Sequence, residues 1–118
     1  MKLHRVHDTT LRIRGYIGDH LQGQLTRLYE EHGATLRTLD LGGTRIVSTA
    51  LRCLLEGRAW PALRSLNLGG ADLSGVASWS GHLSLPSLER INVKGAVAPE
   101  ALLARVGKAA PGCTMNET

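Results

Sequence analysis

Phenylalanine is absent from this sequence of 118 residues, and aromatic residues make up only 3% of it. Apolar residues still amount to 42%, which is enough for one domain to build a core from leucine, valine and alanine. A stack of leucine-bearing strands is one architecture that needs few aromatic rings.

Cysteine and long apolar runs are scarce as well. Cys53 and Cys113 are too few for a disulfide framework, and we therefore expect an intracellular, reducing compartment. No run of about 18 apolar residues occurs, so we expect no membrane span. The basic start lacks the apolar segment of a secretory signal, which favours the cytoplasm; its arginines leave a mitochondrial location open.

The usual marks of catalysis are also missing. The Gly-Gly pairs at 42–43 and 69–70 match neither the dinucleotide-binding motif nor the phosphate-binding loop. His4, His7 and Asp8 offer too few ligands, at a weak spacing, for a zinc site. No serine or cysteine stands in a recognisable frame with a histidine and an acid. We therefore expect no enzymatic activity, no metal, no cofactor and no small-molecule substrate.

A repeated pattern is what this sequence has in abundance. Successive copies start 28, 27 and 25 residues apart, and a period in this range is typical of solenoids, in which each unit packs on its neighbours. The copies read DTTLRIRGYIG from Asp8, LRTLDLGGTRI from Leu36, LRSLNLGGADL from Leu63 and LERINVKGAVA from Leu88.

This pattern resembles the leucine-rich repeat, L-x-x-L-x-L-x-x-N/C-x-L, of the ribonuclease-inhibitor-like or cysteine-containing classes. The resemblance implies an α/β fold, a right-handed βα solenoid with a four-stranded parallel sheet on its concave side and helices on its convex side. It covers one domain, 1–118, with repeats at about 8–35, 36–62, 63–87 and 88–112. Residues 1–7 would form an N-terminal cap, and 113–118 a C-terminal cap or truncated strand.

The residues themselves predict strands near 10–14, 36–41, 63–68 and 88–93, with apolar positions alternating along each. Helical spacing follows the first, second and fourth strands, whereas the serine- and glycine-rich segment 72–85 predicts only a short or broken helix. Glycine recurs after every strand, where it permits a backbone with positive φ. The glycines of this column are Gly15, Gly43, Gly70 and Gly95.

One position departs from the family pattern. The ninth residue of each copy is usually Asn or Cys, whose side chain bonds the turning backbone, but here it is Tyr16, Thr44, Ala71 and Ala96. Threonine can partly replace that bond and alanine cannot. We therefore expect this end of the sheet to be less rigid than in longer members of the family.

The outward positions of the strands are the candidate functional surface. Sixteen such positions carry six basic and two acidic residues, which accounts for the whole net charge of +4. The alternative is that these residues are solvent-exposed strand residues without a binding role. The partner-binding candidates on the expected concave face are Arg12, Arg14, Arg37, Asp40, Arg64, Asn67, Arg90, Asn92 and Lys94.

These features predict a non-catalytic module for protein–protein interaction, an adaptor or structural subunit of a larger complex that binds an acidic partner. The alternative is a nucleic-acid-associated subunit of a ribonucleoprotein, whose phosphates the same arginines would contact. The lack of aromatic residues for base stacking argues against that alternative.

Overall fold

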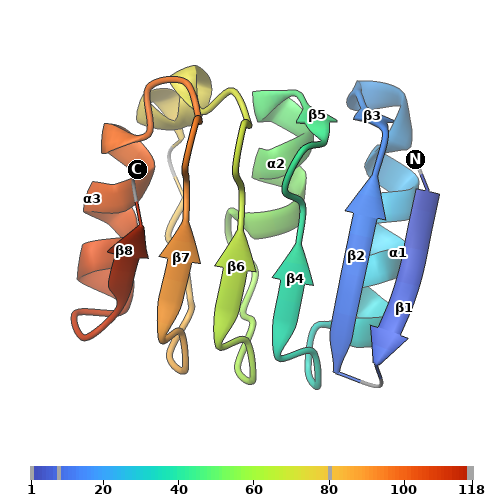
Figure 1. The fold of residues 1–118 in the computed structure, drawn as a ribbon, viewed down its shortest axis with the longest axis horizontal. Coiled ribbons are helices and arrows are strands. Elements are labelled where there is room, and N and C mark those ends of the chain that lie inside the picture. The colour runs from blue at the N-terminus through green and yellow to red at the C-terminus, as the bar shows by residue number, and fades with distance from the viewer. Residues whose placement is uncertain (1, 8, 80, 117–118) are drawn as a thin grey trace.

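One sheet with a layer of helices behind it makes up this α/β fold (Figure 1). The computed structural model describes residues 2–7, 9–79 and 81–116, and for residues 2–7 and 19 it describes the backbone alone. The helices all lie on the same side of the sheet, so the opposite side of the sheet stays open (Figure 1).

The main sheet has six strands in the order β1-β2-β4-β6-β7-β8. The strands β2 to β8 pair in parallel and in sequence order, as the repeats predict. The expected count of four is wrong, because the segments outside the four copies contribute β8 and an antiparallel edge strand, β1. The bounds are β1 Lys2–His7, β2 Thr10–Arg14, β4 Thr38–Asp40, β6 Ser65–Asn67, β7 Arg90–Asn92 and β8 Thr114–Asn116.

The register of β8 differs from the period of the preceding copies. Proline recurs at 61, 86 and 111, and extending this 25-residue spacing would set Asn116 beside Ile91. The structure instead sets Met115 beside Ile91 and Asn116 beside Asn92. Because side chains alternate along a strand, this one-residue shift turns Met115 onto the apolar core and leaves Asn116 exposed.

The helices connect successive strands. They are α1 Gln22–His32, α2 Ser48–Leu55 and α3 Glu100–Ala109, while the 3-10 turns η1 Asp19–Leu21 and η2 Ser74–Ser78 complete the layer. Among the described residues of the connection from β6 to β7, the only helical element is the short turn η2, as the serines and glycines of this segment predict. Two short strands, β3 Tyr16–Ile17 and β5 Arg45–Ile46, pair beyond the main sheet. In the described part of the chain, no helix has the length and apolar character needed to cross a bilayer.

The core lies between the sheet and the helices. Alternate residues along the strands and just after them point into it, as the alternating apolar pattern predicts. Those of the three central units are each at most 1% exposed: Leu39, Leu41, Leu66, Leu68, Ile91 and Val93. Trp60 and Trp79 are buried as well, and the Trp60 indole donates to the Leu54 carbonyl at 3.1 Å. A few large side chains at the ends of the connections thus complete a core made mostly of leucine.

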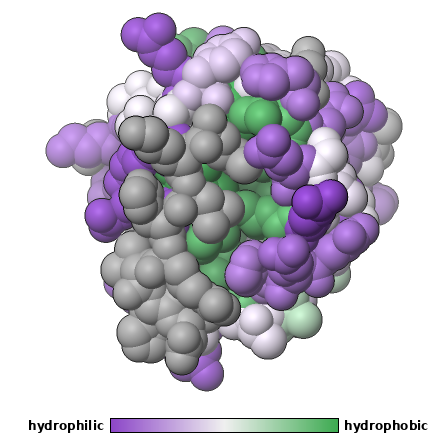
Figure 2. All heavy atoms as spheres, turned by 90° about the vertical axis from the view of Figure 1, so that its right-hand side faces the viewer, coloured by the Kyte–Doolittle hydropathy of each residue, from purple (hydrophilic) through white to green (hydrophobic). Residues whose placement is uncertain are grey.

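Figure 2 shows the end of the stack that carries the N-terminus. On the coloured part of this view, hydrophilic side chains surround a narrow band of apolar atoms. The first repeat contributes Leu11, Ile13 and Leu25 to the same core, each at most 1% exposed. The apolar interior therefore continues through the first unit.

The glycine column has the backbone conformation that the sequence predicts. Gly15, Gly43, Gly70 and Gly95 have φ values of 101°, 77°, 78° and 73°. A side chain at such a φ is strained, whereas glycine adopts it readily. Each strand can therefore turn sharply toward the helix layer at the same point.

Replacing Leu66 by alanine tests the assignment of the buried face. Leu66 is 1% exposed at the centre of the sheet, so the cavity left behind should cost about 2–5 kcal/mol of unfolding free energy. The measurement is thermal or denaturant unfolding. The control is Val97→Ala, because Val97 is 55% exposed and should tolerate truncation. Equal melting temperatures for the Leu66 variant and the wild type would contradict the inward assignment.

Candidate partner-binding face of the sheet

The side of the sheet away from the helices, here called the open face, presents two polar rows that follow from the register. The same register that stacks the apolar residues inward sets polar side chains side by side outward. The first row is Thr10, Thr38, Ser65, Arg90 and Thr114, and the second is Arg12, Asp40, Asn67, Asn92 and Asn116.

Asp40 joins the two cations of the N-terminal half of this face. Arg12 Nε lies 3.2 Å and Arg14 Nη2 lies 3.4 Å from Asp40 Oδ2, and Arg14 also donates to the Ile13 carbonyl. The Asp40 side chain is 17% exposed, while those of Arg12 and Arg14 are 48% and 37% exposed. The candidate residues Arg12, Arg14 and Asp40 therefore form one ionic cluster across β2 and β4.

The environment of Asp40 lowers the pKa of its carboxyl group. Desolvation is the largest single influence and raises the pKa, but the hydrogen bond from the Gly42 amide and those from Arg14 and Arg12 together outweigh it. Asp40 is therefore a carboxylate at neutral pH, and its charge offsets part of the arginine charge nearby.

The second row also closes the turns at the end of the strands. Asp40 Oδ1 accepts the Gly42 amide at 2.9 Å, Asn67 Oδ1 accepts the Gly69 amide at 2.9 Å, and Asn92 Oδ1 accepts the Lys94 amide at 2.8 Å. Each side chain thus bonds the backbone two residues on, a role typical of Asp and Asn. These bonds hold the turn from a different position than the ninth residue of the family pattern.

The ninth position still contributes in one copy. The Thr44 hydroxyl donates to the Leu41 carbonyl at 2.6 Å and is buried, whereas Ala71 offers only its backbone amide, to Leu68 at 3.1 Å. The Thr44 side chain thus bonds the turning backbone, as the sequence predicts for threonine at this position, and Ala71 has no side-chain group that could do so.

Neighbouring repeats approach one another closely at Gly42. A Cβ added there would lie 2.7 Å from Asn67 Nδ2, and the bond from Gly69 holds the Asn67 side chain in that position. A side chain at 42 would therefore have to push Asn67 out of its turn-closing position, whatever the φ of residue 42.

The C-terminal half of the face has cations without a comparable anion. Arg90 and Lys94 are exposed, and neither has a side-chain hydrogen bond or ion pair within the described residues. Beside them lies a hollow of about 290 Å³. Its polar lining consists of Ser65, Asn67, Arg90, Asn92, Thr114 and Asn116.

Arg37 and Arg64 occupy the edge where the chain enters the strands. Both are exposed and lie just before β4 and β6, and the Arg64 amide donates to the Arg37 carbonyl at 2.7 Å. Arg64 Nε lies 3.9 Å from Glu89 Oε2, in a pair whose side chains are 55% and 61% exposed. Such solvated pairs contribute little energy, so both arginines stay available to a ligand.

The pairing register and the ion pairs of Asp40 place six of the nine candidates on the open face, and the other three lie just outside the strands. Arg12, Asp40, Asn67, Arg90 and Asn92 form the central rows, Arg14 and Lys94 lie at the turn end, and Arg37 and Arg64 lie at the entry edge. Sequence reasoning missed Thr114 and Asn116, because it assigned residues 113–118 to a cap or truncated strand without a register. It also missed the turn-closing bonds, which the repeated D/N-x-G of 40–42 and 67–69 could have indicated.

Other chemical groups give no alternative site in the described part of the chain. No group of three His, Cys, Asp or Glu residues there could hold a metal ion, while the side chains of His4, His7 and Asp8 lie outside the described residues. Cys53 and Cys113 are both free thiols, and burial raises the pKa of Cys113, which makes it less reactive.

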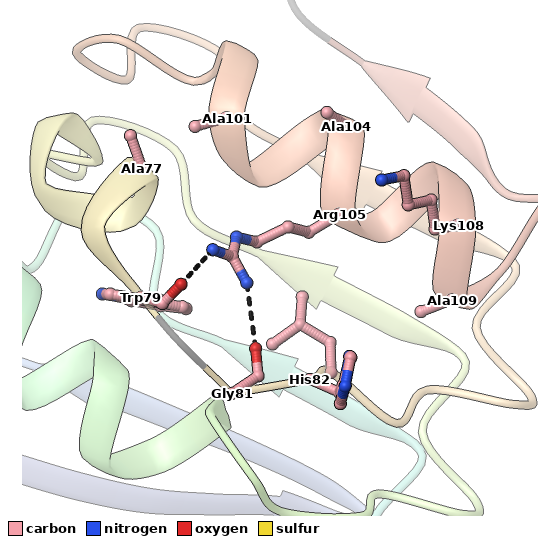
Figure 3. Close-up of a pocket in the computed structure, with 10 residues that line it drawn as sticks. Ala77, Trp79, Gly81, His82, Ala101, Ala104, Arg105, Lys108 and Ala109 are labelled. Carbon is pink, nitrogen blue, oxygen red and sulfur yellow. Dashed lines mark hydrogen bonds between the residues drawn. The ribbon is translucent and has the colours of Figure 1, made fainter.

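A cleft of about 600 Å³ lies on the helix side, between η2 and α3 (Figure 3). Arg105 reaches from α3 into it and donates to the carbonyls of Trp79 and Gly81, in the latter case at 2.9 Å. Its guanidinium therefore ties the connection after η2 to the last helix. Alanines form much of the remaining wall, and His82 and Lys108 are its other polar residues.

No family model, curated protein or solved structure matches this chain. What the open face can do therefore follows from its own groups. It offers guanidinium, ammonium, amide and hydroxyl donors, with two carboxylates among them. This inventory suits the binding of anions by hydrogen bonds that a charge strengthens.

Replacing Asp40 by asparagine tests the ionic cluster. The amide oxygen can still accept the Gly42 amide, but the charge that holds Arg12 and Arg14 is lost, so unfolding at neutral pH should become easier by about 1 kcal/mol or less. Because the folded pKa of Asp40 lies below its ordinary value, the carboxylate contributes stability above that value. This contribution disappears as the pH falls through the folded pKa.

The measurement is denaturant unfolding of both proteins from about pH 7 down to about pH 2. The difference in stability should be largest near neutral pH and should shrink in acid. A difference that stays constant over the whole range would mean that the charge of Asp40 contributes nothing to folding.

Proposed function

We propose that this chain is a leucine-rich repeat module without catalytic activity, an adaptor or structural subunit that binds an acidic protein partner through the open face. The observation that carries the proposal is the charge of that face. Three arginines lie on the side of the sheet that no helix covers, and three more cations lie at the ends of its strands, against two carboxylates. The cations are Arg12, Arg14 and Arg90 on the face and Arg37, Arg64 and Lys94 at the strand ends, and the carboxylates are Asp40 and Glu89.

The repeat architecture is supported by the equivalent positions that the successive strand–helix units share. Each of the four copies places its apolar pair inward and a glycine with positive φ after the strand. The second, third and fourth copies also place an Asp or Asn outward, where the first has Arg12. Strand–helix units of this kind cannot bury their apolar faces alone, and stacking gives them a shared core. A protein built in this way has a broad polar face that is free for binding.

The proposal of an acidic partner is supported by exposed cations that have no partner in the described part of the fold itself. Three cations of this region form no side-chain hydrogen bond or ion pair within the described residues: Arg37, Arg90 and Lys94. The contacts of the structure therefore give their charges no role in stabilising the fold. Like charges on neighbouring strands repel one another unless a ligand compensates them. The two rows of the open face contain no aromatic ring for base stacking, which favours a protein partner over single-stranded nucleic acid.

The double variant Arg37→Glu with Arg64→Glu tests this function. Both residues are exposed, so the circular dichroism spectrum and folding should stay unchanged, while reversing two charges at the entry edge should abolish association with the natural partner. The measurement is affinity purification from cells that express the protein, followed by quantitative mass spectrometry of the retained proteins.

The matched control is Arg27→Glu with Lys108→Glu, which reverses two exposed charges on α1 and α3. This variant should retain the same proteins as the wild type. Loss of the partners in the control, with retention in the Arg37 and Arg64 variant, would place binding on the helix side. Retention of RNA alone by the wild type, with a steep dependence on salt, would favour the nucleic-acid alternative.

A further inference from the structure

The turn-closing bonds decide which polar atoms the open face shows to a ligand. The Oδ1 atoms of Asn67 and Asn92 already accept the backbone amides of Gly69 and Lys94. An amide nitrogen turned toward a backbone N–H would repel it, so this orientation is fixed by the fold. The remaining groups of both side chains are their NH₂ donors, which make no hydrogen bond within the described residues.

The hollow between β6, β7 and β8 is therefore rich in donors. The lining supplies one guanidinium, from Arg90, the NH₂ groups of Asn67 and Asn92, and the hydroxyl groups of Ser65 and Thr114. Asn116 at its rim offers both a donor and an acceptor, and Lys94 lies two residues beyond Asn92. A hydroxyl can donate or accept, but the guanidinium and the NH₂ groups can only donate. The complementary ligand is an acceptor with negative charge.

The N-terminal half of the same face shows what such a ligand looks like. At the position equivalent to Asn67 and Asn92, Asp40 uses one oxygen for the turn and the other for Arg12 and Arg14. Asparagine replaces this built-in carboxylate at 92. The cations near it, Arg90 and Lys94, make no ion pair within the described residues, and the neighbouring Glu89 lies nearest to Arg64.

We infer that the hollow between β6, β7 and β8 binds a carboxylate, an Asp or Glu side chain of the protein partner, between Arg90 and Asn92. There the partner's carboxylate supplies the charge that Asp40 supplies beside Arg12 and Arg14. The planar guanidinium of Arg90 suits the two oxygens of a carboxylate. This inference rests on the proposed function and places a specific contact within it.

The test uses Asn92→Asp in the full chain, with a fluorescent hexaglutamate peptide as the probe. The new carboxylate has nearly the same shape and can still accept the Lys94 amide, as Asp40 accepts that of Gly42, so the fold should persist. The same carboxylate would offset the positive charge of Arg90 in the hollow and leave less charge for a ligand. Fluorescence anisotropy should show affinity for hexaglutamate falling by at least about tenfold, with hexaglutamine as the uncharged control peptide.

Two further variants separate a local effect from a change in net charge. Gln24→Glu adds the same single charge on exposed α1 and should change the affinity by less than about twofold at physiological salt. Asp40→Asn removes the built-in anion and releases Arg12 and Arg14, so it should bind hexaglutamate more tightly than the wild type.

Arg90→Gln provides a second probe of the hollow, because it removes the charge of an exposed side chain and should weaken hexaglutamate binding as well. If both Asn92→Asp and Arg90→Gln bind like the wild type while Arg37→Glu with Arg64→Glu does not, the hollow is the wrong place and the face is right. Failure of the wild-type protein to bind hexaglutamate above hexaglutamine would overturn the carboxylate contact. The partner-retention experiment judges the proposed function separately.

Discussion

Parallel register between the repeats is the constraint on which the rest of this structure depends. It sets Leu11, Leu39, Leu66, Ile91 and Met115 side by side under the sheet, so each unit buries its apolar residues against its neighbours. A slip of one residue would exchange the buried and exposed sets. Since strands in a sheet lie about 4.8 Å apart, the same register also spaces the outward side chains. The binding surface is therefore a consequence of how the core packs.

The turns show how a strict local requirement is met by different residues. Each turn needs an acceptor for a backbone amide and a backbone of positive φ, and the second need restricts Gly43 and Gly70. The first is met on the open face by Asp40, Asn67 and Asn92, and not by the family's ninth position. These turns are therefore closed by side chains that belong to the outward row of the strands themselves.

Much of this fold follows from the sequence, because the repeat fixes both which residues pair and which face is buried. The edges do not follow, since no neighbouring copy sets their register: 2–7 becomes an antiparallel strand, and Met115 rather than Asn116 lies beside Ile91. The candidate residues could be assigned to one surface from their strand positions. The sequence does not predict that this surface divides into an ion-paired half and a half whose cations are unpaired within the described residues. The pairing of Asp40 with Arg12 and Arg14 depends on side-chain geometry.

The difference between the two halves of the open face comes down to one atom at equivalent positions. The backbone amide after each strand needs one oxygen, and Asp40 and Asn92 supply it equally well. The turn therefore makes no demand on the second polar atom of the side chain, which is an oxygen in Asp40 and a nitrogen in Asn92. That atom decides whether the nearby arginine charge is neutralised from within or remains for a partner. A repeat can thus vary its surface chemistry without disturbing the turn that holds its strands in register.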